Sequence, residues 1–560
     1  MRTAASIPRF PREVVAINWI APPAVSVAIK KPAPDEPSHP LVTLLQYAPR
    51  FNQIKHRSKN MTARRQGGDE PLAAVDLGSN SFRLLIAKED GGQIVPISTY
   101  REGVRLAGGL NDGNEVAEEK LAEACDALAR FRERLASIPR DRVRAVATST
   151  YRVAKNRVEL LKASEVALGV NIDVISGQEE ARLIYLGCAH TLPWSEQERL
   201  IVDIGGGSTE FIVGQRYEPE LTESFPLGAV TLSQNFFPGA TVTAAAFRKA
   251  EVFVRTRVEV LQKRYKQGWP VAYGSSGTIR ALHEIVTENN FGDVITVDAL
   301  LKLKSAMIEA GQVNRLELAA LKSSRAPVLP GGLAILLGLM QELNVKAIEP
   351  AEGALRLGVL YDLLHRSDAP SNTDPRSITV SRLQSRYGAD TEQASRVTAL
   401  AQTLWVGVAG AASGADPAPD PLLSWAAAVH EIGMAIAHED YHRHSAYVIE
   451  HSDLYGFSEQ ERSALATLVL GHTGTLKKLN RDALSPALLK RLGCLRLAAL
   501  FCHGRVDEMP IIALRSQGDS LALQLYSGWL SKRPLTAALL DEETARWAKF
   551  GVALALDIRA

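Results

Sequence analysis

The amino-acid sequence predicts an α/β protein with two similar lobes around a cleft, followed by an all-α domain and a small C-terminal α+β appendage. From Leu72 to about Leu364, short β-rich runs alternate with amphipathic helical patterns, which is typical of α/β folds. Two segments of this region repeat one strand–turn–strand pattern, and a long region rich in Ala, Leu and His follows it. The chain has 560 residues, more than the roughly 250 to 300 at which one hydrophobic core stops growing, so several domains are expected.

Composition and charge narrow the class of protein. Hydrophobic residues make up 46% of the chain and charged residues 22%, which is ordinary for a folded globular protein. The formal net charge of +2 gives no reason to expect a nucleic-acid partner. No uninterrupted apolar run of about 20 residues appears, so no stable membrane insertion is expected. The four cysteines lie far apart and form no C-x-x-C pair, which fits a reducing compartment, the cytoplasm.

Residues 1–68 predict a disordered basic arm. They contain eleven Lys or Arg against three Asp or Glu, repeated prolines, and no sustained helical or strand period. An apolar stretch follows the first arginines as in a signal peptide, but Pro22 and Pro23 interrupt it. We therefore do not expect a signal peptide.

The two predicted lobes, residues 69–190 and 191–370, each begin with a strand, a polar glycine turn and a second strand. The first copy runs from Leu72 to Ala87 and the second from Leu200 to Gly214. Two matched copies imply lobes that face each other and aim both turns at one cleft. A helix predicted from Glu118 to Leu135 carries an apolar stripe, which we interpret as core.

The glycine turns have the composition of phosphate-binding loops. Glycines after an aspartate at a strand end let the backbone turn tightly and point N–H groups at a phosphate, and Ser or Thr hydroxyls add donors. A lone turn of this kind is more often structural, but two matched copies favour function. A third segment ends a strand and begins a helix, which makes a further anion site. The predicted phosphate-binding residues are Gly78, Ser79, Asn80, Ser81 and Arg83 at the first turn, Gly205, Gly206, Gly207, Ser208 and Thr209 at the second, and Ser276, Gly277 and Thr278 at the third.

Three carboxylates flank these turns and predict a magnesium site. Asp76 and Asp203 precede the first two turns, and Glu210 lies on the second arm of the second hairpin. Mg²⁺ takes one or two carboxylates together with waters and substrate phosphate oxygens, and it neutralises charge during phosphoryl transfer. The structural alternative is an aspartate that caps its own turn, which is common for Asp76 and less so for Asp203.

A pair of acids, Glu179 and Glu180, follows Ser176 where a strand gives way to a helix. By composition alone, such a pair more often caps a helix and complements its dipole than takes part in catalysis. The neighbouring turns favour catalysis, because hydrolysis of a phosphate needs a carboxylate that orients and deprotonates water. Past another strand, the segment from Thr148 to Arg152 offers hydroxyls and a guanidinium that could fork onto phosphate.

Four motifs together resemble the exopolyphosphatase and guanosine pentaphosphate phosphatase family in its long bacterial form: Asp76-Leu-Gly-Ser-Asn-Ser-Phe-Arg, Ser176-Gly-Gln-Glu-Glu-Ala-Arg-Leu-Ile, Asp203-Ile-Gly-Gly-Gly-Ser-Thr-Glu and Gly274-Ser-Ser-Gly-Thr. The resemblance covers roughly residues 70 to 365 and implies the fold of actin, sugar kinases and Hsp70. It also implies that Glu180 is the general base and that Arg152 binds phosphate. Asp203 and Glu210 are then the carboxylates on the magnesium side.

The helical region, residues 376–514, is rich in histidine. Its His430-Glu431 pair is followed by other histidines, and the region resembles the metal-dependent His-Asp phosphohydrolase domain. Because Glu stands where that domain has Asp, a longer carboxylate would displace a tightly set coordination shell. We therefore predict a degenerate, structural domain that helps to form a basic channel or a dimer contact. Residues 515–560 mix a strand-like run with a helix and form the small appendage.

These features predict a magnesium-dependent exopolyphosphatase that releases terminal phosphate from inorganic polyphosphate and forms a homodimer. The alternative substrate is guanosine pentaphosphate, since the motifs of the family serve both. Two other classes stay open. An ATP-dependent kinase of the same fold is disfavoured by the segment from Ser176 to Ile184, and a catalytically idle sensor is disfavoured by the retention of Glu180, Asp203 and Glu210.

Overall fold

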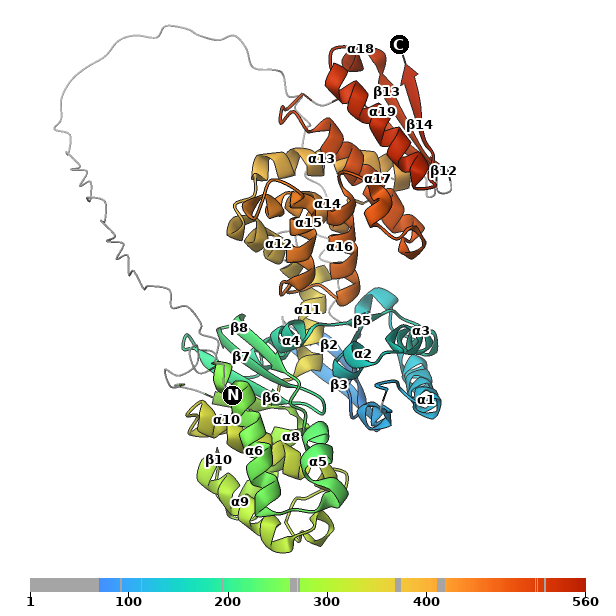
Figure 1. The fold of residues 1–560 in the computed structure, drawn as a ribbon. Helices are drawn as coiled ribbons and strands as arrows, with labels where there is room; N and C mark the ends of the chain where they lie inside the picture. The colour runs from blue at the N-terminus through green and yellow to red at the C-terminus, as the bar shows by residue number, and fades with distance from the viewer. Residues whose placement is uncertain are drawn as a thin grey trace, which may run out of the picture. The chain divides into compact units, whose positions relative to one another are not determined.

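The computed structural model describes most of the chain beyond the predicted basic arm, and the arm itself, residues 1–68, lies outside the described residues. The described ranges are 70–90, 93–111, 113–193, 195–261, 269, 272–367, 374–409, 418–508, 510, 512–517 and 520–559. All of them belong to one compact unit, residues 65–560. Figure 1 shows its helices and strands in chain order from blue to red.

The first lobe is built on a five-stranded mixed sheet with the strand order β3-β2-β1-β4-β5. Strands β1, β2 and β3 form an antiparallel meander, and β4 and β5 run parallel to β1 on its other side. The strands are β1 (Leu72–Leu77), β2 (Phe82–Asp90), β3 (Gln93–Glu102), β4 (Val143–Ala147) and β5 (Ile172–Val174). Three helices lie in the connections between them: α1 (Glu118–Leu135), α2 (Ser149–Val153) and α3 (Arg157–Leu168). The apolar stripe of α1 is buried, because Leu128 and Phe131 pack into the core of this lobe.

The second lobe repeats this topology in a six-stranded sheet with the order β10-β11-β9-β6-β7-β8. Strands β6, β7 and β8 form the meander, β9 and β11 continue the sheet in parallel, and β10 is added antiparallel to β11. The strands are β6 (Arg199–Ile204), β7 (Thr209–Gln215), β8 (Glu218–Phe225), β9 (Ala272–Ser275), β10 (Ile295–Thr296) and β11 (Ala347–Pro350). The helices are α5 (Ala229–Phe236), α6 (Ala244–Val258), α8 (Ser276–Glu288), α9 (Val297–Ala310) and α10 (Leu329–Glu342).

Two helices, α4 (Gly177–Ala189) and α11 (Leu355–Ser367), join the lobes. They pack against each other, while α4 also contacts β7 and β8 and α11 contacts β1. Their backbones approach closely at two glycines, since a Cβ on Gly358 would lie 1.7 Å from the Leu183 carbonyl oxygen and one on Gly187 would lie 2.3 Å from the Ala354 carbonyl oxygen. Only glycine allows this spacing, so the crossing depends on the sequence at these positions.

Helices α12 to α17 form the helical domain, and a three-stranded sheet with two helices forms the appendage. The helices of the domain are α12 (Pro375–Arg386), α13 (Thr391–Ala409), α14 (Pro421–Val429), α15 (Tyr441–His451), α16 (Glu459–Gly471) and α17 (Pro486–Phe501). The appendage contains β12 (Ile512–Gln517), β13 (Ser520–Tyr526), α18 (Ser527–Leu530), α19 (Pro534–Lys549) and β14 (Leu554–Arg559). One hydrophobic core extends through both, and the buried ion pair between Arg496 and Glu543 links α17 to α19.

This architecture confirms the predicted fold class: two similar lobes of the actin, sugar kinase and Hsp70 type, then a helical domain and a small α+β appendage. Each lobe carries its polar turn between the first two strands of its meander. Within the ranges given above, no helix is both long and apolar enough to span a bilayer.

Candidate active site

The two polar turns are equivalent hairpin loops, one from each lobe. Residues 78–81 connect β1 to β2, and residues 205–208 connect β6 to β7. The turns approach each other, since a Cβ placed on Gly206 would lie 3.5 Å from the Asn80 Cβ, and one on Gly207 would lie 2.6 Å from the Ser149 Oγ. The lobes therefore bring both turns to one place, as the repeat predicts.

One cavity between the lobes is lined by both turns and by most of the residues predicted to act there. Of the predicted phosphate-binding residues, its lining includes Gly78, Ser79, Asn80, Ser81, Arg83, Gly205, Gly206, Gly207, Ser208, Ser276, Gly277 and Thr278. The acids Asp76, Glu180 and Asp203 line it as well. Thr209 does not, because its buried hydroxyl donates a hydrogen bond to the Leu227 carbonyl and so supports the hairpin instead.

The third turn places a strained residue in this cavity. Ser276 has a φ of 92°, which a residue with a Cβ rarely adopts. Its Oγ accepts hydrogen bonds from the N–H groups of Thr278, at 3.2 Å, and Ile279, at 3.3 Å, where α8 begins. Strained backbone of this kind persists only where the surroundings impose it, and it clusters at functional sites.

The paired acids at the start of α4 have different surroundings. Glu179 is fully buried and accepts two hydrogen bonds from Arg182, at 2.7 and 2.8 Å, so it faces away from the cavity. Glu180 lines the cavity and accepts a hydrogen bond on Oε2 from the Arg152 Nη1 at 2.9 Å. The same Nη1 donates to the Ile175 carbonyl at 2.8 Å. Arg152 was expected to fork onto phosphate, and the structure instead places it on the candidate base.

Like charges and burial shape the acidic side of the cavity. Burial raises the pKa of Asp203 to about 7, the Ser275 hydroxyl lowers that pKa by hydrogen bonding, and the nearby charges of Glu180 and Asp76 raise it. Burial also raises the pKa of Asp76 to about 6, partly offset by two arginines and reinforced by Glu180. The pKa of Glu210 is raised well above its ordinary value by burial first, then by the charges of Glu180 and Asp203.

The chemistry of these donors fits a divalent cation. Asp76, Glu180, Asp203 and Glu210 form a buried cluster of carboxylates, and a cation is the natural way to offset their mutual repulsion. Among the described residues, no group of three or more His, Cys, Asp or Glu has the arrangement of a complete metal site. An ion here would therefore use one or two carboxylates and take its other ligands from water and a bound phosphate, as Mg²⁺ commonly does.

Two arginines from outside the predicted motifs also line the cavity, Arg325 and Arg356. Burial lowers the pKa of each to about 10. The Nε and Nη1 atoms of Arg356 are buried without a hydrogen-bond partner. Arg325 lies against the third turn, since a Cβ on Gly277 would be 2.1 Å from its Nη2. Neither arginine belongs to a glycine motif, so no local pattern identifies them.

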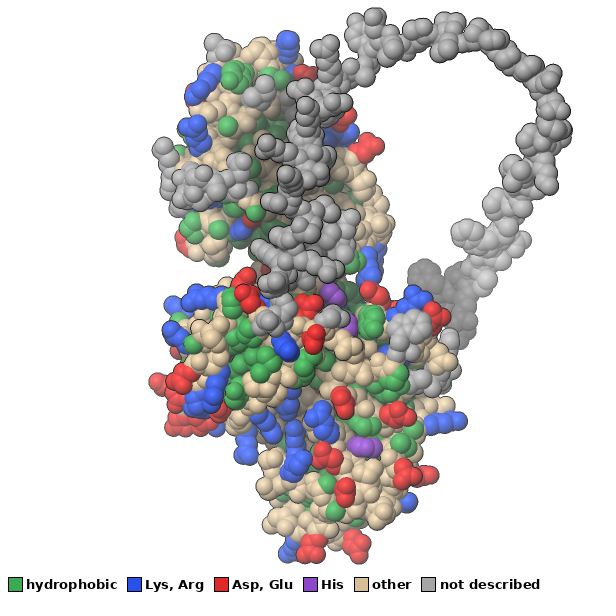
Figure 2. Space-filling view, turned by 180° about the vertical axis from the view of Figure 1, so that it is seen from behind, with side chains coloured by type: hydrophobic (Ala, Val, Ile, Leu, Met, Phe, Trp, Pro, Cys, Tyr) green, Lys and Arg blue, Asp and Glu red, His purple; other side chains and the backbone are tan. Residues whose placement is uncertain are grey.

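A second, arginine-rich cavity lies beside the first and shares Arg83, Arg325 and Arg356 with it. Arg101 and Arg280 complete the group of arginines that line it. None of these five arginines forms an ion pair with another residue in the described ranges. Figure 2 shows basic side chains gathered on one face of the lobes. Arg83, Arg325 and Arg356 are half-buried, where a guanidinium without an ion pair is costly, and Arg101 and Arg280 are exposed, so this surface is suited to an anionic ligand.

The predicted histidine-rich region forms a buried cluster in the helical domain. The ring centroids of His430 and His472 are 5.1 Å apart, and those of His442 and His472 are 6.3 Å apart. His430 and His472 each use Nδ1 to contact a backbone carbonyl, and burial lowers the pKa of all three rings, that of His442 to about 4. Glu431 accepts hydrogen bonds from Arg505 at 2.8 and 3.0 Å. A structural role for this domain stays a prediction that these contacts favour.

The fold and the cavity define an enzyme that handles phosphate: matched glycine turns, an acidic cluster and arginines without an ion pair among the described residues meet between two α/β lobes. Residues 85–367 match the Ppx/GppA phosphatase family, and residues 376–544 match domain III of the Ppx/GppA phosphatases. The chain belongs to the Ppx/GppA phosphatase family and is a hydrolase of phosphoric anhydrides.

Solved structures of similar proteins include a Ppx/GppA family member from Aquifex aeolicus. It is 26% identical, and the match has a TM-score of 0.47 and covers 54% of this chain and 99% of that one. An exopolyphosphatase from Cytophaga hutchinsonii is 24% identical, with a TM-score of 0.47 and coverage of 53% and 98%. Each match spans nearly all of the related chain and about half of this one.

Proposed function

We propose that the chain is an exopolyphosphatase that removes the terminal phosphate of inorganic polyphosphate. The observation that carries this proposal is the continuity of two cavities that share three arginines. The first also holds three acids and the glycine turns, and the second is lined by five arginines that form no ion pair within the described residues. A chain with a negative charge at every repeat can place its end in the first cavity and its next phosphates against the arginines.

The lining of the two cavities favours an inorganic chain over guanosine pentaphosphate, the alternative substrate. Among the described residues, no aromatic side chain lines either cavity. A site that selects a nucleotide commonly stacks the base on an aromatic ring or holds it in an apolar slot. Guanidinium planes can also stack on a base, so the arginines alone do not exclude a nucleotide, and the two substrates are compared directly in the assay below.

Glu180 is the proposed general base. Its Oε2 is held by Arg152 at 2.9 Å, and Oε1 has no partner among the described residues, so Oε1 is free to accept a proton from water. The water oxygen forms a bond to the terminal phosphorus as the bond to the bridging oxygen breaks. The water proton passes to Glu180, and the shortened polyphosphate leaves with the electron pair of that bond. Arg152 acts in this scheme as a positioning residue for the base.

The turns hold the terminal phosphate in the proposed complex. Backbone N–H groups at Gly78, Gly206 and Gly207 are the donors, while the Gly205 N–H closes the hairpin on the Ser208 carbonyl at 2.9 Å; the hydroxyls of Ser79 and Ser208 add to these donors. One or two of the carboxylates Asp203, Glu210 and Asp76 would hold Mg²⁺, which when bound offsets the charge of the phosphate oxygens. The charges of Arg83 and Arg356 act on Asp76, so cationic and anionic groups lie together where the phosphate chain would bind.

The test measures Mg²⁺-dependent phosphate release from long-chain polyphosphate and, in parallel, from guanosine pentaphosphate. Wild type is compared with Glu180→Gln and with Glu119→Gln, an exposed control on α1. We expect polyphosphate turnover that Glu180→Gln lowers by about a hundredfold or more and that Glu119→Gln leaves intact. Faster turnover of the nucleotide would favour the alternative substrate. Activity on neither, or full activity of Glu180→Gln, would refute the proposal.

A further inference from the structure

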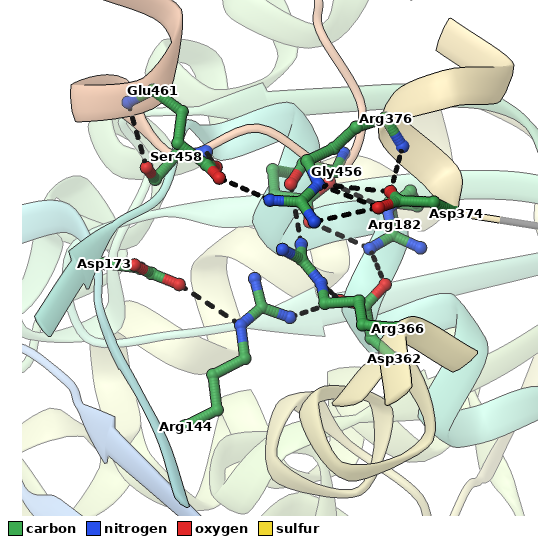
Figure 3. Close-up of polar contacts among 11 residues, drawn as sticks. Arg144, Asp173, Arg182, Asp362, Arg366, Asp374, Arg376, Gly456, Ser458 and Glu461 are labelled. Atoms are coloured by element: carbon green, nitrogen blue, oxygen red, sulfur yellow. Dashed lines mark hydrogen bonds and ion pairs between the residues drawn. The ribbon is translucent and has the colours of Figure 1, made fainter. Parts of the chain in front are cut away.

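We infer that a loop of the helical domain, residues 454–457, positions two carboxylates of the acidic cluster: Glu180, which lines the active-site cavity, and Glu210, which lies buried next to it. The inference rests on the proposed function for its catalytic consequence. It assigns the helical domain a part in holding the active site. Figure 3 shows the polar contacts around Gly456 of this loop, on the side of α4 and α11.

The first contact reaches the start of α4. The Gly456 N–H donates to the Glu179 Oε2 at 2.8 Å, and Glu179 is fully buried between this loop and Arg182. Glu179 directly precedes Glu180 in the first turn of α4, where the Glu180 N–H donates to the Ser176 carbonyl at 2.9 Å. A helix turn is stiff, so a fixed Glu179 also fixes the direction in which the Glu180 side chain leaves the backbone.

A network of buried ion pairs around Asp362 supports the contact between Gly456 and Glu179. Asp362 on α11 is fully buried and accepts hydrogen bonds from Arg182, Arg144 and Arg366, the last at 2.7 Å. Arg366 also donates to the Gly456 carbonyl at 2.6 Å. Figure 3 shows these side chains converging from β4, α4 and α11. Each charge has a partner, so the network resists movement of the loop relative to α4.

The second contact reaches β8 in the other lobe. The hydroxyls of Tyr455 and Thr222 are hydrogen-bonded at 2.8 Å. Two residues further along β8, the Ser224 Oγ donates to the Glu210 Oε1 at 2.9 Å. Residues two apart on a strand share a face, so Thr222 and Ser224 point to the same side of β8. The loop thus contacts β8 two residues away from Ser224, the residue through which this strand is hydrogen-bonded to Glu210.

The loop is itself fixed within the helical domain. Gly456 has a φ of +87°, and a Cβ there would lie 2.9 Å from the Arg376 backbone nitrogen. The Thr379 Oγ1 donates to the Tyr455 carbonyl at 2.8 Å, and Arg376 is in turn bound by Asp374 at 2.8 Å. A change in the helical domain that moves this loop would therefore be felt by carboxylates of both lobes.

A merely structural interface would affect stability alone, so the test separates kcat from KM. Tyr455→Phe and Thr222→Val each remove one hydroxyl of the contact to β8. We expect each to lower kcat on polyphosphate about threefold to tenfold with KM changed less than about twofold, since a misplaced catalytic group slows the reaction more than it weakens binding. The double variant should be no slower than the slower single variant. Tyr447→Phe, an exposed tyrosine of the same domain, is the control.

Gly456→Ala tests the contact to α4, because its Cβ would displace the loop. Amide hydrogen exchange in α4 and β8 is measured on the same full-length proteins without substrate. Faster exchange in α4 for Gly456→Ala and in β8 for Tyr455→Phe, with the control unchanged, supports the inference. Unchanged exchange in both elements overturns it, as do unchanged kcat values in an active enzyme. A wild type inactive on polyphosphate would refute the proposed function instead, and the exchange data would still decide whether the loop positions these elements.

Discussion

Replacing Asp203 by asparagine separates two effects of the acidic cluster: its mutual repulsion, which destabilises the fold, and its proposed binding of magnesium. In the folded protein, the Asp203 carboxylate lies among Glu180, Asp76 and Glu210 and is almost completely buried. Asparagine has nearly the same shape and keeps a side-chain oxygen that can accept a hydrogen bond, but it carries no charge. The substitution should therefore stabilise the metal-free protein at alkaline pH while it removes a proposed magnesium ligand.

The magnitude follows from the pKa of Asp203, which burial raises from 3.8 to about 7. A carboxyl whose pKa is raised in the folded state binds its proton more tightly there than in the unfolded state. The free energy of unfolding therefore falls as the pH rises from the unfolded-state pKa to the folded-state pKa. The interval of about three pH units, at about 1.4 kcal/mol each, sets an upper value of about 4 kcal/mol above pH 7. Relaxation of the cluster reduces it, and we expect about 2 to 4 kcal/mol.

The assay is urea unfolding of wild type and Asp203→Asn in EDTA at pH 5 and pH 8. At pH 5 the folded-state carboxyl is still mostly protonated but the unfolded-state carboxyl is already ionised, so the variant should be the more stable by less than half of the full difference. At pH 8 the variant should be the more stable, and added Mg²⁺ should narrow the gap. Asp126→Asn, at an exposed position on α1, controls for helix and surface effects. Equal differences between variant and wild type at both pH values would refute the reasoning.

Three further predictions concern the arginines and the helix crossing. Arg152→Gln should lower kcat about tenfold to a hundredfold with little change in KM, because the guanidinium holds the base rather than the substrate; initial rates over a range of polyphosphate concentrations measure this. Arg356→Gln should raise KM for long-chain polyphosphate about tenfold, since a hydrogen bond to a charged group contributes about 1.5 to 3 kcal/mol, and the same assay reads it. Gly358→Ala should lower the free energy of unfolding by about 3 kcal/mol or more, because its Cβ would lie 1.7 Å from the Leu183 carbonyl oxygen, and urea unfolding measures the loss.

Each of these has a matched control. Arg248→Gln replaces an exposed arginine on α6 and should change neither kcat nor KM. Gly103→Ala adds a Cβ where nothing lies within 4 Å and should unfold like wild type. A KM increase for Arg152→Gln with kcat intact would place that arginine on the substrate, as the sequence alone suggested. Normal stability of Gly358→Ala would contradict the close crossing of α4 and α11.

The fold was open to prediction because its signals are local and repeated. The two strand–turn–strand copies lie in continuous sequence, and each turn carries its aspartate and glycines within a few residues. Their meeting across the cleft follows from symmetry, and the structure brings Gly206 to Asn80 as expected. The same locality explains why most of the turn residues were predicted and why they line one cavity.

Other parts of the site depend on contacts between distant segments. Apart from the family resemblance, nothing in the sequence tells which of Glu179 and Glu180 faces the cavity. The structure directs Glu179 toward Gly456 and Glu180 into the cavity. Arg325 and Arg356 reach the cavity from outside every motif. Thr209 has the composition of a phosphate ligand, yet its hydroxyl is used by the Leu227 carbonyl. Such outcomes are set by tertiary packing, which no local pattern encodes.

The two cavities place carboxylates and unpaired arginines side by side, and this has a thermodynamic consequence. A cation that binds the acids lowers the repulsion felt by an incoming phosphate, and a bound phosphate supplies oxygens to the cation, so the two affinities are coupled. Linkage makes that coupling reciprocal, with the same factor in both directions. Under the proposed function, the affinity of this site for a phosphate chain is therefore not one constant but a function of the free divalent cation concentration.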